Sequence, residues 1–536
     1  MLEGLMQNDF QLTVNAMRRR LRTCYPRQEV VTLEDGGPVR ATYAEVADRV
    51  DRLGRVLERL GVQQGDRIGT FGWNSQRHFE LYMAVPSYGA ILHTINIRLF
   101  PDQVSYIINH AQDRVLFIDG TLVESFAKLS EGCEAVQTYV VMGDGDLDAL
   151  PNALSYERLL DEAGPGEYDW PELDERAAAA LCYTSGTTGN PKGVLYSHRS
   201  VSLHSTTVCT TDAMGLSSAD RVLVIVPMFH VNAWGLPFAA ALTGTGLLLP
   251  GPYLQGEALA RVIEGERATV VAGVPTVLGA LLEHVDAEGG DLSSLRTGLC
   301  GGSAVPRSLM EGFERHGVRI LQGWGMTETS PLVTVARPPS DVTDPEEQWS
   351  YRVTQGRTLP WCDLRLSEGA NEIEARGPWV AARYYEDPSG DDKFTDDGWL
   401  RTGDIGEIDD QGYVRITDRA KDLIKSGGEW ISSVEVETLL IEHPSVREAA
   451  VIAIPDERWG ERPLACVALA EGADASMADL REHLSSGLAR WQLPDAFAFI
   501  EEVPKTSVGK FDKKVLRARL AEGDLEVLRA ERDAIR

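Results

Sequence analysis

The segment that decides the fold is Tyr183–Val194, which reads YTSGTTGNPKGV. Glycines let backbone N–H groups approach a ligand, hydroxyls donate further hydrogen bonds and lysine adds a point charge, so this composition suits a polyphosphate. It is not a Walker A loop, because two residues separate Gly189 from Lys192. A flexible surface loop is the alternative interpretation, and its position directly after the apolar stretch Ala177–Cys182 argues against it.

The chain on both sides of this segment alternates short β-branched runs with helical patterns. Arg221–Val226 (RVLVIV) and Val270–Gly273 are typical of buried strands, and Pro275–Val285 (PTVLGALLEHV) predicts a helix with proline in its first turn. Such alternation over 536 residues predicts a layered α/β fold with largely parallel sheets.

The composition changes in the C-terminal part of the chain. Gly398–Gly428 is rich in Gly, Asp and Lys. Lysine is scarce in the whole chain, with nine lysines against 43 arginines, yet six of the nine lysines follow residue 420. Beyond it, Ser433–His443 predicts a helix, whereas Ala449–Ile454 and Leu464–Leu469 predict strands. We therefore predict an N-terminal domain over residues 1–420 and a C-terminal domain over residues 421–536.

Charge and cysteine content exclude several classes of protein. The formal net charge is −29, and no long basic run could neutralise phosphates, so we expect no nucleic-acid partner. Seven scattered cysteines without a C-x-x-C pair indicate a reducing compartment rather than a disulfide framework or zinc site. The first residues do not resemble a signal peptide, and no apolar run approaches about 20 residues, so we expect a cytoplasmic protein without integral membrane contact.

Six further segments follow one another along the chain, and their order supports an assignment to a known family. They are Pro227–Trp234 (PMFHVNAW), Gly301–Pro306 (GGSAVP), Gly323–Thr329 (GWGMTET), Arg401–Ile405 (RTGDI), Asp418–Ile431 (DRAKDLIKSGGEWI) and Pro504–Lys510 (PKTSVGK). Together with the glycine-rich segment, they resemble the core motifs of the adenylate-forming superfamily. This superfamily contains acyl-CoA synthetases, the adenylation domains of peptide synthetases and firefly luciferase. The resemblance covers about residues 10 to 520.

The resemblance implies a two-step reaction and a fold. A carboxylate attacks the α-phosphate of ATP and releases pyrophosphate, and a thiol, usually that of coenzyme A, then displaces AMP. The implied substrates and cofactors are a carboxylic acid, ATP, Mg²⁺ and coenzyme A. The implied α/β fold has a large N-terminal domain of two doubly wound sheets plus a small β-barrel-like element. A smaller, mobile C-terminal α+β domain follows.

The resemblance also assigns residues to the phosphates and the metal. The phosphate-binding set is Thr184, Ser185, Gly186, Thr187, Thr188, Gly189 and Lys192. Glu328, with Thr184, would hold Mg²⁺, which prefers hard oxygen ligands. Thr327 would contact the α-phosphate. Lys510 would stabilise the charge that gathers between the carboxylate and the α-phosphate. The predicted catalytic set is Lys510, Glu328, Thr184 and His230.

Adenine and ribose take a second set of residues. Trp324 would lie against adenine, opposite the backbone of Gly301–Ala304. The other residues assigned around the base are Gly302, Ser303, Ala304, Gly323, Gly325 and Met326. Asp404 would accept hydrogen bonds from the ribose hydroxyls, a common use of a carboxylate at a nucleotide site, and Arg419 would be a second ribose contact.

The acyl group is expected near His230, which in the family orients the carboxylate. Peptide-synthetase domains carry an Asp just after this position, whereas Val231 follows here, which argues against an α-amino acid. The predicted acyl pocket consists of His230, Val231, Asn232, Trp234 and Gly235. Its apolar surroundings suit an alkyl chain, whose burial gives about 0.8 kcal/mol per CH₂. Trp234 is expected to gate the acyl tunnel.

The second step is assigned to the C-terminal domain. Gly427, Gly428, Glu429 and Trp430 resemble the segment that lines the pantetheine tunnel, where glycines permit close passage of a thin ligand arm. Lys421 occupies the hinge position. The resemblance implies that the domain rotates about it, presenting Lys510 for adenylation and the Gly427–Trp430 segment for thioester formation.

Specific phrases resemble one branch of the superfamily. VPMFHVNAWG, GVPTV, IKSGGEWISSVEVE and WQLPDA are similar to bacterial fatty-acid–CoA ligases of medium- or long-chain preference. The branch also contains 3-(methylthio)propionate–CoA ligases, so a short acid remains an alternative, as does transfer to a carrier protein. A non-catalytic relative would have degraded motifs, whereas the motifs here are intact, so we do not expect this alternative. A homodimer is expected.

Two departures from the family pattern stand out. Asp418 occupies a position where glycine is usual. Asn371 replaces a common glycine in Asp363–Ile373, which we expect to form a shortened surface turn without loss of activity.

Overall fold

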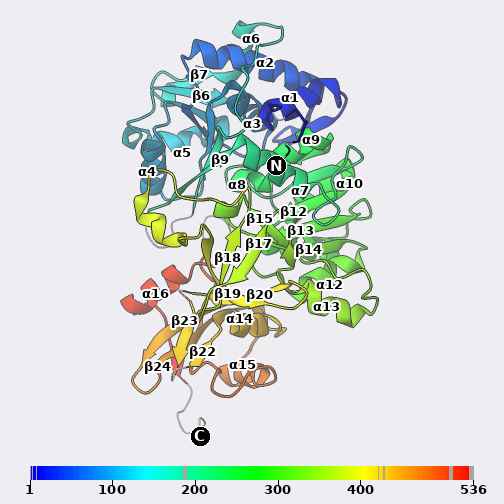
Figure 1. Cartoon of the computed structure of the whole chain (residues 1–536). Coiled ribbons are helices and arrows are strands. Elements are labelled where there is room, and N and C mark those ends of the chain that lie inside the picture. The colour runs from blue at the N-terminus through cyan, green and yellow to red at the C-terminus, as the bar shows by residue number, and fades with distance from the viewer. Residues whose placement is uncertain are drawn as a thin grey trace.

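The computed structural model describes residues 2, 4–7, 9–184, 190–420, 422–426, 429–505 and 511–529, apart from the side chains of residues 389 and 391. Within these residues the strands form four sheets. Two large sheets with their helices fill the upper part of Figure 1, a small sheet lies below them, and the C-terminal sheet lies at the bottom. The first two sheets carry most of the predicted nucleotide motifs.

The first large sheet has parallel strands at its centre and antiparallel strands at its edges. Its order is β16 (Arg357–Thr358), β15 (Leu332–Val335), β14 (Arg319–Gly325), β13 (Thr297–Gly301), β12 (Val270–Gly273), β10 (Arg221–Val224), β11 (Gly246–Leu249), β1 (Glu29–Glu34) and β2 (Gly37–Thr42). The carboxyl ends of β13 and β14 hold the GGSAVP and GWGMTET segments. Parallel strands therefore bring these two motifs to one edge of the sheet.

The second large sheet is parallel except for its last strand. Its order is β7 (Leu154–Ser155), β6 (Thr138–Met142), β5 (Val115–Asp119), β3 (Arg67–Phe71), β4 (Ile91–Thr94), β8 (Ala178–Tyr183) and β9 (Gly193–Ser197). The glycine-rich segment connects β8 to the antiparallel strand β9. It therefore leaves the carboxyl end of a parallel strand, the usual position of ligand-binding loops in open α/β sheets.

A shared hydrophobic core joins the two large sheets. Buried side chains of both sheets pack with those of α1 (Val14–Thr23), α2 (Tyr43–Arg59), α3 (Gln76–Tyr88), α7 (His198–Val208) and α9 (Leu236–Thr243). The other face of the first sheet packs against α10 (Gly256–Glu266), α11 (Pro275–Glu288) and α12 (Arg307–Arg315). The other face of the second sheet packs against α4 (Pro101–Ala111) and α5 (Val123–Ala127). The chain further forms α6 (Tyr156–Ala163) and α13 (Pro345–Arg352).

Local sequence explains where several helices begin. Thr42 and Glu45 form a capping box at the start of α2, and Ser75 caps α3 through the backbone N–H of His78. Pro101 and Pro275 open α4 and α11, where the missing N–H costs nothing. The helix predicted over Pro275–Val285 is confirmed and continues to Glu288.

The small sheet and the C-terminal sheet complete the fold. The small antiparallel sheet consists of β17 (Asp363–Leu366), β18 (Glu372–Arg376), β19 (Leu400–Ile408) and β20 (Val414–Arg419). The C-terminal sheet contains β21 (Ile424–Ser426), β22 (Glu429–Ile431), β23 (Val446–Asp456), β24 (Gly460–Leu469), β25 (Ala496–Phe499) and β26 (Leu528–Arg529). It packs with α14 (Ser433–Ile441), α15 (Met477–Leu484) and α16 (Lys513–Glu522).

The predicted fold class is confirmed: two doubly wound sheets, a small β element and a C-terminal α+β unit. The strand predicted over Arg221–Val226 ends at Val224. The reason is that the side-chain NH₂ group of Asn74 donates hydrogen bonds to the carbonyls of Val224 and Val226, at 2.7 and 2.9 Å. Asn371 adopts φ +51°, as the predicted turn requires. All seven cysteines are free thiols, and Cys24 is exposed.

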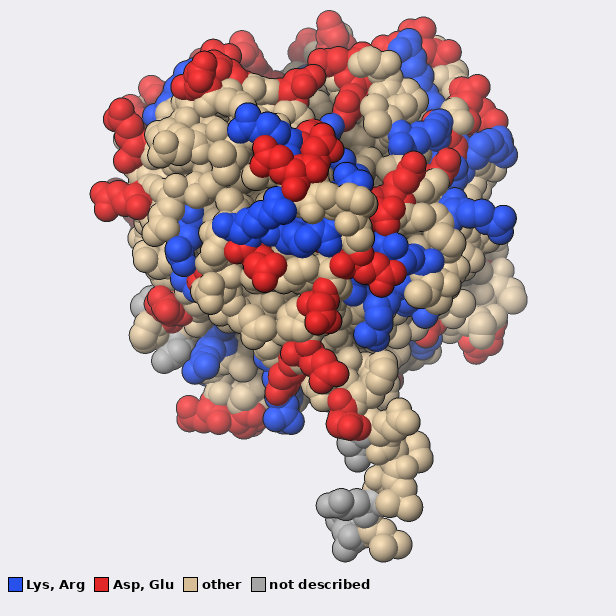
Figure 2. Space-filling view, turned by 90° about the horizontal axis from the view of Figure 1, so that it is seen from above, with Lys and Arg blue, Asp and Glu red and all other residues tan. Residues whose placement is uncertain are grey.

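The surface carries its charge in mixed form. On the face seen in Figure 2, acidic and basic side chains are interspersed. No helix within the described part of the chain is both long and apolar enough to cross a membrane.

Candidate active site

The stem of the glycine-rich loop holds two predicted phosphate ligands together. Tyr183 of β8 pairs with Gly193 of β9. Beyond this pair, the Thr184 N–H donates to the Lys192 carbonyl at 2.9 Å, and the Lys192 N–H donates to Thr184 Oγ1 at 3.0 Å. The predicted ligands Ser185, Gly186, Thr187, Thr188 and Gly189 lie outside the described residues. The stem thus places Thr184 and Lys192 side by side.

The Lys192 ammonium group and the Glu328 carboxylate meet at one tyrosine. Lys192 Nζ lies 5.0 Å from the centre of the Tyr384 ring and 3.3 Å from Asp387 Oδ2. The Tyr384 hydroxyl donates to Glu328 Oε1 at 2.7 Å. Burial, with the nearby Glu328 carboxylate, raises the pKa of the Tyr384 hydroxyl well above its usual range, so Tyr384 remains a donor. The structure therefore brings the predicted phosphate lysine and metal ligand to one place.

The donor set fits a magnesium ion that is held mainly by a nucleotide. In the described part of the chain, no three His, Cys, Asp or Glu side chains cluster as metal ligands. Mg²⁺ at a nucleotide site typically uses one or two protein oxygens plus phosphates and water. The Glu328 carboxylate and the Thr184 hydroxyl supply such oxygens.

The predicted ribose residues lie in direct contact. Trp324 Nε1 donates to Asp404 Oδ2 at 2.9 Å, and Arg419 Nε lies 2.6 Å from Asp404 Oδ1. Asp404 and Arg419 also face each other in the β19–β20 register. Asp404 is 1% exposed, and its Oδ1 receives no hydrogen bond of good geometry within the described residues. A buried carboxylate oxygen with acceptor capacity to spare fits a ribose hydroxyl.

Trp324 has a second role in packing. It is 8% exposed and belongs to a hydrophobic cluster with Val333 and Trp379 that joins the first large sheet to the small one. The indole is therefore held both by this cluster and by Asp404, so the ring is fixed before any ligand arrives.

A glycine-lined approach of two strands adjoins Trp324. Gly301 pairs with Gly323 across β13 and β14, and a Cβ atom on Gly301 would stand 2.6 Å from the Gly323 carbonyl oxygen. Gly302 follows with φ +89°, a conformation that favours glycine. Gly302, Ser303 and Ala304 are exposed, so their backbone is open to a ligand.

The predicted acyl segment forms an unusual left-handed turn. In α8 (Val231–Trp234), residues Val231, Asn232, Ala233 and Trp234 have φ between 47 and 57°, and Gly235 follows at 75°. Four consecutive non-glycine residues in this region are costly, above all the β-branched valine. The prediction of an acyl pocket here carried no indication of this handedness.

Buried contacts hold the turn in place. Cys182 Sγ lies 3.5 Å from Asn232 Oδ1, and the Gly235 N–H donates to the Asn232 carbonyl at 2.9 Å. A Cβ atom on Gly235 would stand 2.8 Å from His204 Nδ1. The Trp234 ring reaches Gly301, where Cη2 would lie 3.5 Å from a Cβ atom. Trp234 thus links the predicted acyl segment to the nucleotide strands, while His230 lies at the N-terminal end of the turn.

The C-terminal motifs are described only in part. Lys421, Gly427, Gly428 and Lys510 lie outside the described residues. Glu429 and Trp430 lie on β22, where Trp430 is 56% exposed and Lys425 Nζ is 5.5 Å from its ring centre.

The contacts of Asp418 explain why an aspartate occupies this position, where glycine is usual in the family. Its carboxylate accepts the backbone N–H of Ser433 and, at 2.9 Å, the Ser433 hydroxyl, at the first residue of α14. Lys513 Nζ donates to the same hydroxyl at 2.7 Å. Burial raises the pKa of Asp418, although Lys513 opposes the shift. The strand before the predicted hinge is therefore tied to α14 and α16.

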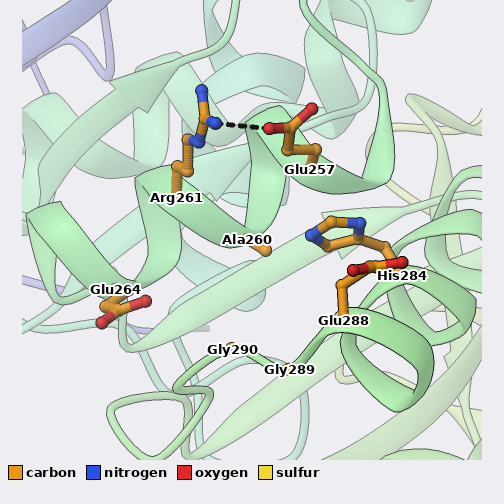
Figure 3. A pocket seen from close by; sticks show the side chains of 8 residues that line it. All are labelled: Glu257, Ala260, Arg261, Glu264, His284, Glu288, Gly289 and Gly290. Atoms are coloured by element: carbon orange, nitrogen blue, oxygen red, sulfur yellow. Dashed lines mark hydrogen bonds and ion pairs between the residues drawn. The ribbon is translucent and has the colours of Figure 1, made fainter.

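A separate hollow lies away from these residues. A surface groove of about 520 Å³ lies between α10 and α11. Figure 3 shows the residues that line it, which are Glu257, Ala260, Arg261, Glu264, His284, Glu288, Gly289 and Gly290. Arg261 is engaged by Glu257 within it. None of the predicted site residues that the structure describes lines this groove.

Comparison with known proteins identifies the family. The model of the AMP-binding enzyme family matches residues 19–385, and the model of the AMP-binding enzyme C-terminal domain matches residues 435–510. The chain belongs to the AMP-binding enzyme family. The predictions of an adenylate-forming enzyme and of an acid–thiol ligase are confirmed.

Three relatives show the range of the family near this chain. A long-chain-fatty-acid–CoA ligase of Thermus thermophilus is 45% identical over 95% of this chain and 96% of its own. A 3-methylmercaptopropionyl-CoA ligase of Ruegeria lacuscaerulensis is 44% identical over 91% of this chain and 94% of its own. The crystal structure of the anthranilate CoA ligase AuaEII with anthranoyl-AMP has a TM-score of 0.86 at 25% identity, covering 97% of this chain and all of its own. Similarity alone does not separate a long acid from a short one.

Proposed function

We propose that this chain is an ATP-dependent acyl-CoA ligase that activates a medium- or long-chain fatty acid with Mg²⁺ and ATP and transfers it to coenzyme A. The observation that carries the proposal is the convergence of Trp324, Asp404 and Arg419 beside the glycine-lined ends of β13 and β14. Residues from different sheets meet there as a nucleoside site would require.

Adenylation follows from the charges. A carboxylate oxygen attacks the α-phosphorus, the bond to the bridging oxygen of pyrophosphate breaks, and pyrophosphate leaves. Both reactants are anions, so positive groups must offset their repulsion. Lys192 would hold the outer phosphates, and Lys510 would stabilise the charge between the reacting groups. Mg²⁺, on Glu328 and Thr184, would neutralise phosphate charge.

Thioester formation completes the reaction. The sulfur of coenzyme A, having lost its proton, attacks the acyl carbon, and the bond to the phosphate oxygen breaks to release AMP. We assign the thiol arm to the segment Gly427–Trp430. We also propose that residues 1–420 and 421–536 are separate domains with a hinge at Lys421. This division is supported by β20 and β21, which belong to different sheets.

The acyl assignment rests on an apolar neighbourhood. Val231 and Ala233 are buried, and Trp234 is partly buried against the shared core. Such a lining suits an alkyl chain, and the 45% identity to a long-chain-fatty-acid–CoA ligase supports it. The alternative is a short acid such as 3-(methylthio)propionate, supported by the 44% identity to the 3-methylmercaptopropionyl-CoA ligase. Acyl transfer to a carrier protein, homodimer formation and a cytoplasmic location stay predictions.

A substrate panel tests the proposal. Pyrophosphate release is measured with Mg²⁺ and ATP on acids from acetate to palmitate and on 3-(methylthio)propionate, each with and without coenzyme A. We expect turnover that needs coenzyme A and an optimum at octanoate or a longer acid. An optimum at 3-(methylthio)propionate would select the alternative. Single-turnover release without turnover on coenzyme A would favour a carrier protein.

A further inference from the structure

Arg462 of β24 is an arginine whose every donor is used. It is 4% exposed. Its Nε and Nη2 donate to the Asp495 carboxylate at 2.6 and 3.0 Å, and Nη2 also donates to the Leu493 carbonyl at 2.8 Å. Nη1 donates to Ser426 Oγ at 2.9 Å and to the Trp491 carbonyl at 2.6 Å. One guanidinium group therefore joins β21, β24 and residues 491–495.

Ser426 connects the guanidinium group of Arg462 to the β21–β22 hairpin. It is the last residue of β21, where it pairs with Glu429 of β22 and with Gly460 of β24. The Lys425 N–H donates to the Glu461 carboxylate at 2.8 Å, which ties the same strand to β24 a second time. Only two residues separate Ser426 from Glu429 in the sequence. The guanidinium of Arg462 thus stands at the base of the β21–β22 hairpin.

Only arginine can make this set of contacts. Five N–H groups in a rigid, planar fork meet one carboxylate, two carbonyls and one hydroxyl, whereas a lysine ammonium is a single point with three donors. A lysine would leave buried acceptors unpaired, and such losses cost more than the net gain of an ordinary hydrogen bond. Geometry at this site is therefore specific to arginine.

We propose that Arg462 is a positioning residue for thioester formation: it fixes the β21–β22 hairpin against residues 491–495 so that the thiol arm of coenzyme A enters in one orientation. It does not touch the reacting atoms. The inference rests on the proposed function, in which this hairpin lines the path of that arm. None of the four groups that Arg462 contacts belongs to the cluster of Trp324, Asp404 and Glu328, so adenylation does not depend on it.

Measuring the two half-reactions separately tests the inference on the full chain. Adenylation is followed as a single-turnover burst of pyrophosphate without coenzyme A, using the acid that gives the fastest release. Transfer is followed by adding coenzyme A to the preformed acyl-adenylate. The variants are Arg462→Lys and Ser426→Ala. Arg447→Lys is the matched control, because Arg447 is an exposed arginine of the same sheet whose described side-chain bond goes to the Glu501 carbonyl.

We expect Ser426→Ala to slow transfer about tenfold, since it removes one charge-assisted hydrogen bond. Arg462→Lys is expected to slow transfer further, and both variants are expected to keep adenylation within about twofold of the wild type. Retained adenylation also shows that the C-terminal domain is folded, because Lys510 belongs to it. Arg447→Lys is expected to leave both half-reactions unchanged.

Two results would overturn the inference. Wild-type transfer in Ser426→Ala would remove the link between the guanidinium and the hairpin. An equal loss of both half-reactions in Ser426→Ala would show a merely structural contact. If Arg462→Lys does not fold, Ser426→Ala still decides. A wild-type enzyme that forms the adenylate but transfers nothing to coenzyme A would instead refute the proposed function, and the inference would fall with it.

Discussion

Asp404→Asn is the substitution that most sharply probes the nucleotide site. Asp404 Oδ2 accepts the Trp324 N–H at 2.9 Å, and Oδ1 lies 2.6 Å from Arg419 Nε. An asparagine has one oxygen and one NH₂ group, so whichever way it turns, one donor faces another donor. The substitution changes no volume. Its effect therefore reports on charge and hydrogen bonding alone.

The magnitude follows from the lost contact. A hydrogen bond to a charged group contributes about 1.5–3 kcal/mol, so losing one at the ribose lowers kcat/KM for ATP by about 30-fold for 2 kcal/mol. Initial rates of pyrophosphate release at varied ATP measure this loss. Asp410→Asn is the matched control, because Asp410 is exposed in the turn after β19. We expect this control to behave as the wild type.

A nucleotide analogue tests the cause. If Asp404 accepts the ribose hydroxyls, 2′,3′-dideoxy-ATP costs the wild type a similar factor and costs Asp404→Asn almost nothing more. Additive losses would mean that Asp404 acts elsewhere. Wild-type kcat/KM for ATP in Asp404→Asn would refute the ribose assignment outright.

Three further predictions follow from the geometry. Gly301→Ala should lower kcat/KM for ATP at least about tenfold and lower Tm, because the new Cβ meets the Gly323 carbonyl and overpacking costs about 1–3 kcal/mol; unchanged values for both would contradict this. Trp234→Ala should raise basal adenylation or broaden the range of chain lengths used, and identical kinetics on every acid would exclude a gating role. Burial lowers the pKa of His78 and His198 to about 4 and that of His204 to about 3, so between about pH 4 and 6.5 the unfolded chain binds more protons than the folded one. Stability should therefore rise with pH over this window, by up to about 1.4 kcal/mol per pH unit for each histidine, and denaturation midpoints that do not change from pH 5 to 7 would contradict the assignment.

The motifs predicted which residues belong to the site better than they predicted which of these residues contact one another. Thr184, Lys192, Asp404 and Arg419 were recognised from short segments, and the structure places them in pairs. Sequence reasoning missed Tyr384, which lies 56 positions from its partner Glu328 and belongs to no recognised spacing. A contact of this kind depends on how the small sheet packs on the first large one, and no local pattern encodes it.

The left-handed turn at Val231–Trp234 and the exact ends of strand β23 could not be predicted from the sequence, for other physical reasons. Residues Val231 and Trp234 disfavour positive φ, so only the surrounding packing explains the left-handed turn. In the C-terminal sheet, the strand predicted over Ala449–Ile454 extends over Val446–Asp456, because charged residues at its start interrupt the apolar run without ending the pairing. Local propensity was outweighed by tertiary contacts in both cases.

The central claim is that a carboxylate oxygen attacks the α-phosphate of ATP. The most direct test uses a fatty acid whose carboxylate carries ¹⁸O, in a complete reaction with Mg²⁺, ATP and coenzyme A, followed by mass spectrometry of the products. The proposed chemistry predicts that one labelled oxygen appears in AMP and none in pyrophosphate. AMP without label, or label in pyrophosphate or inorganic phosphate, would contradict it.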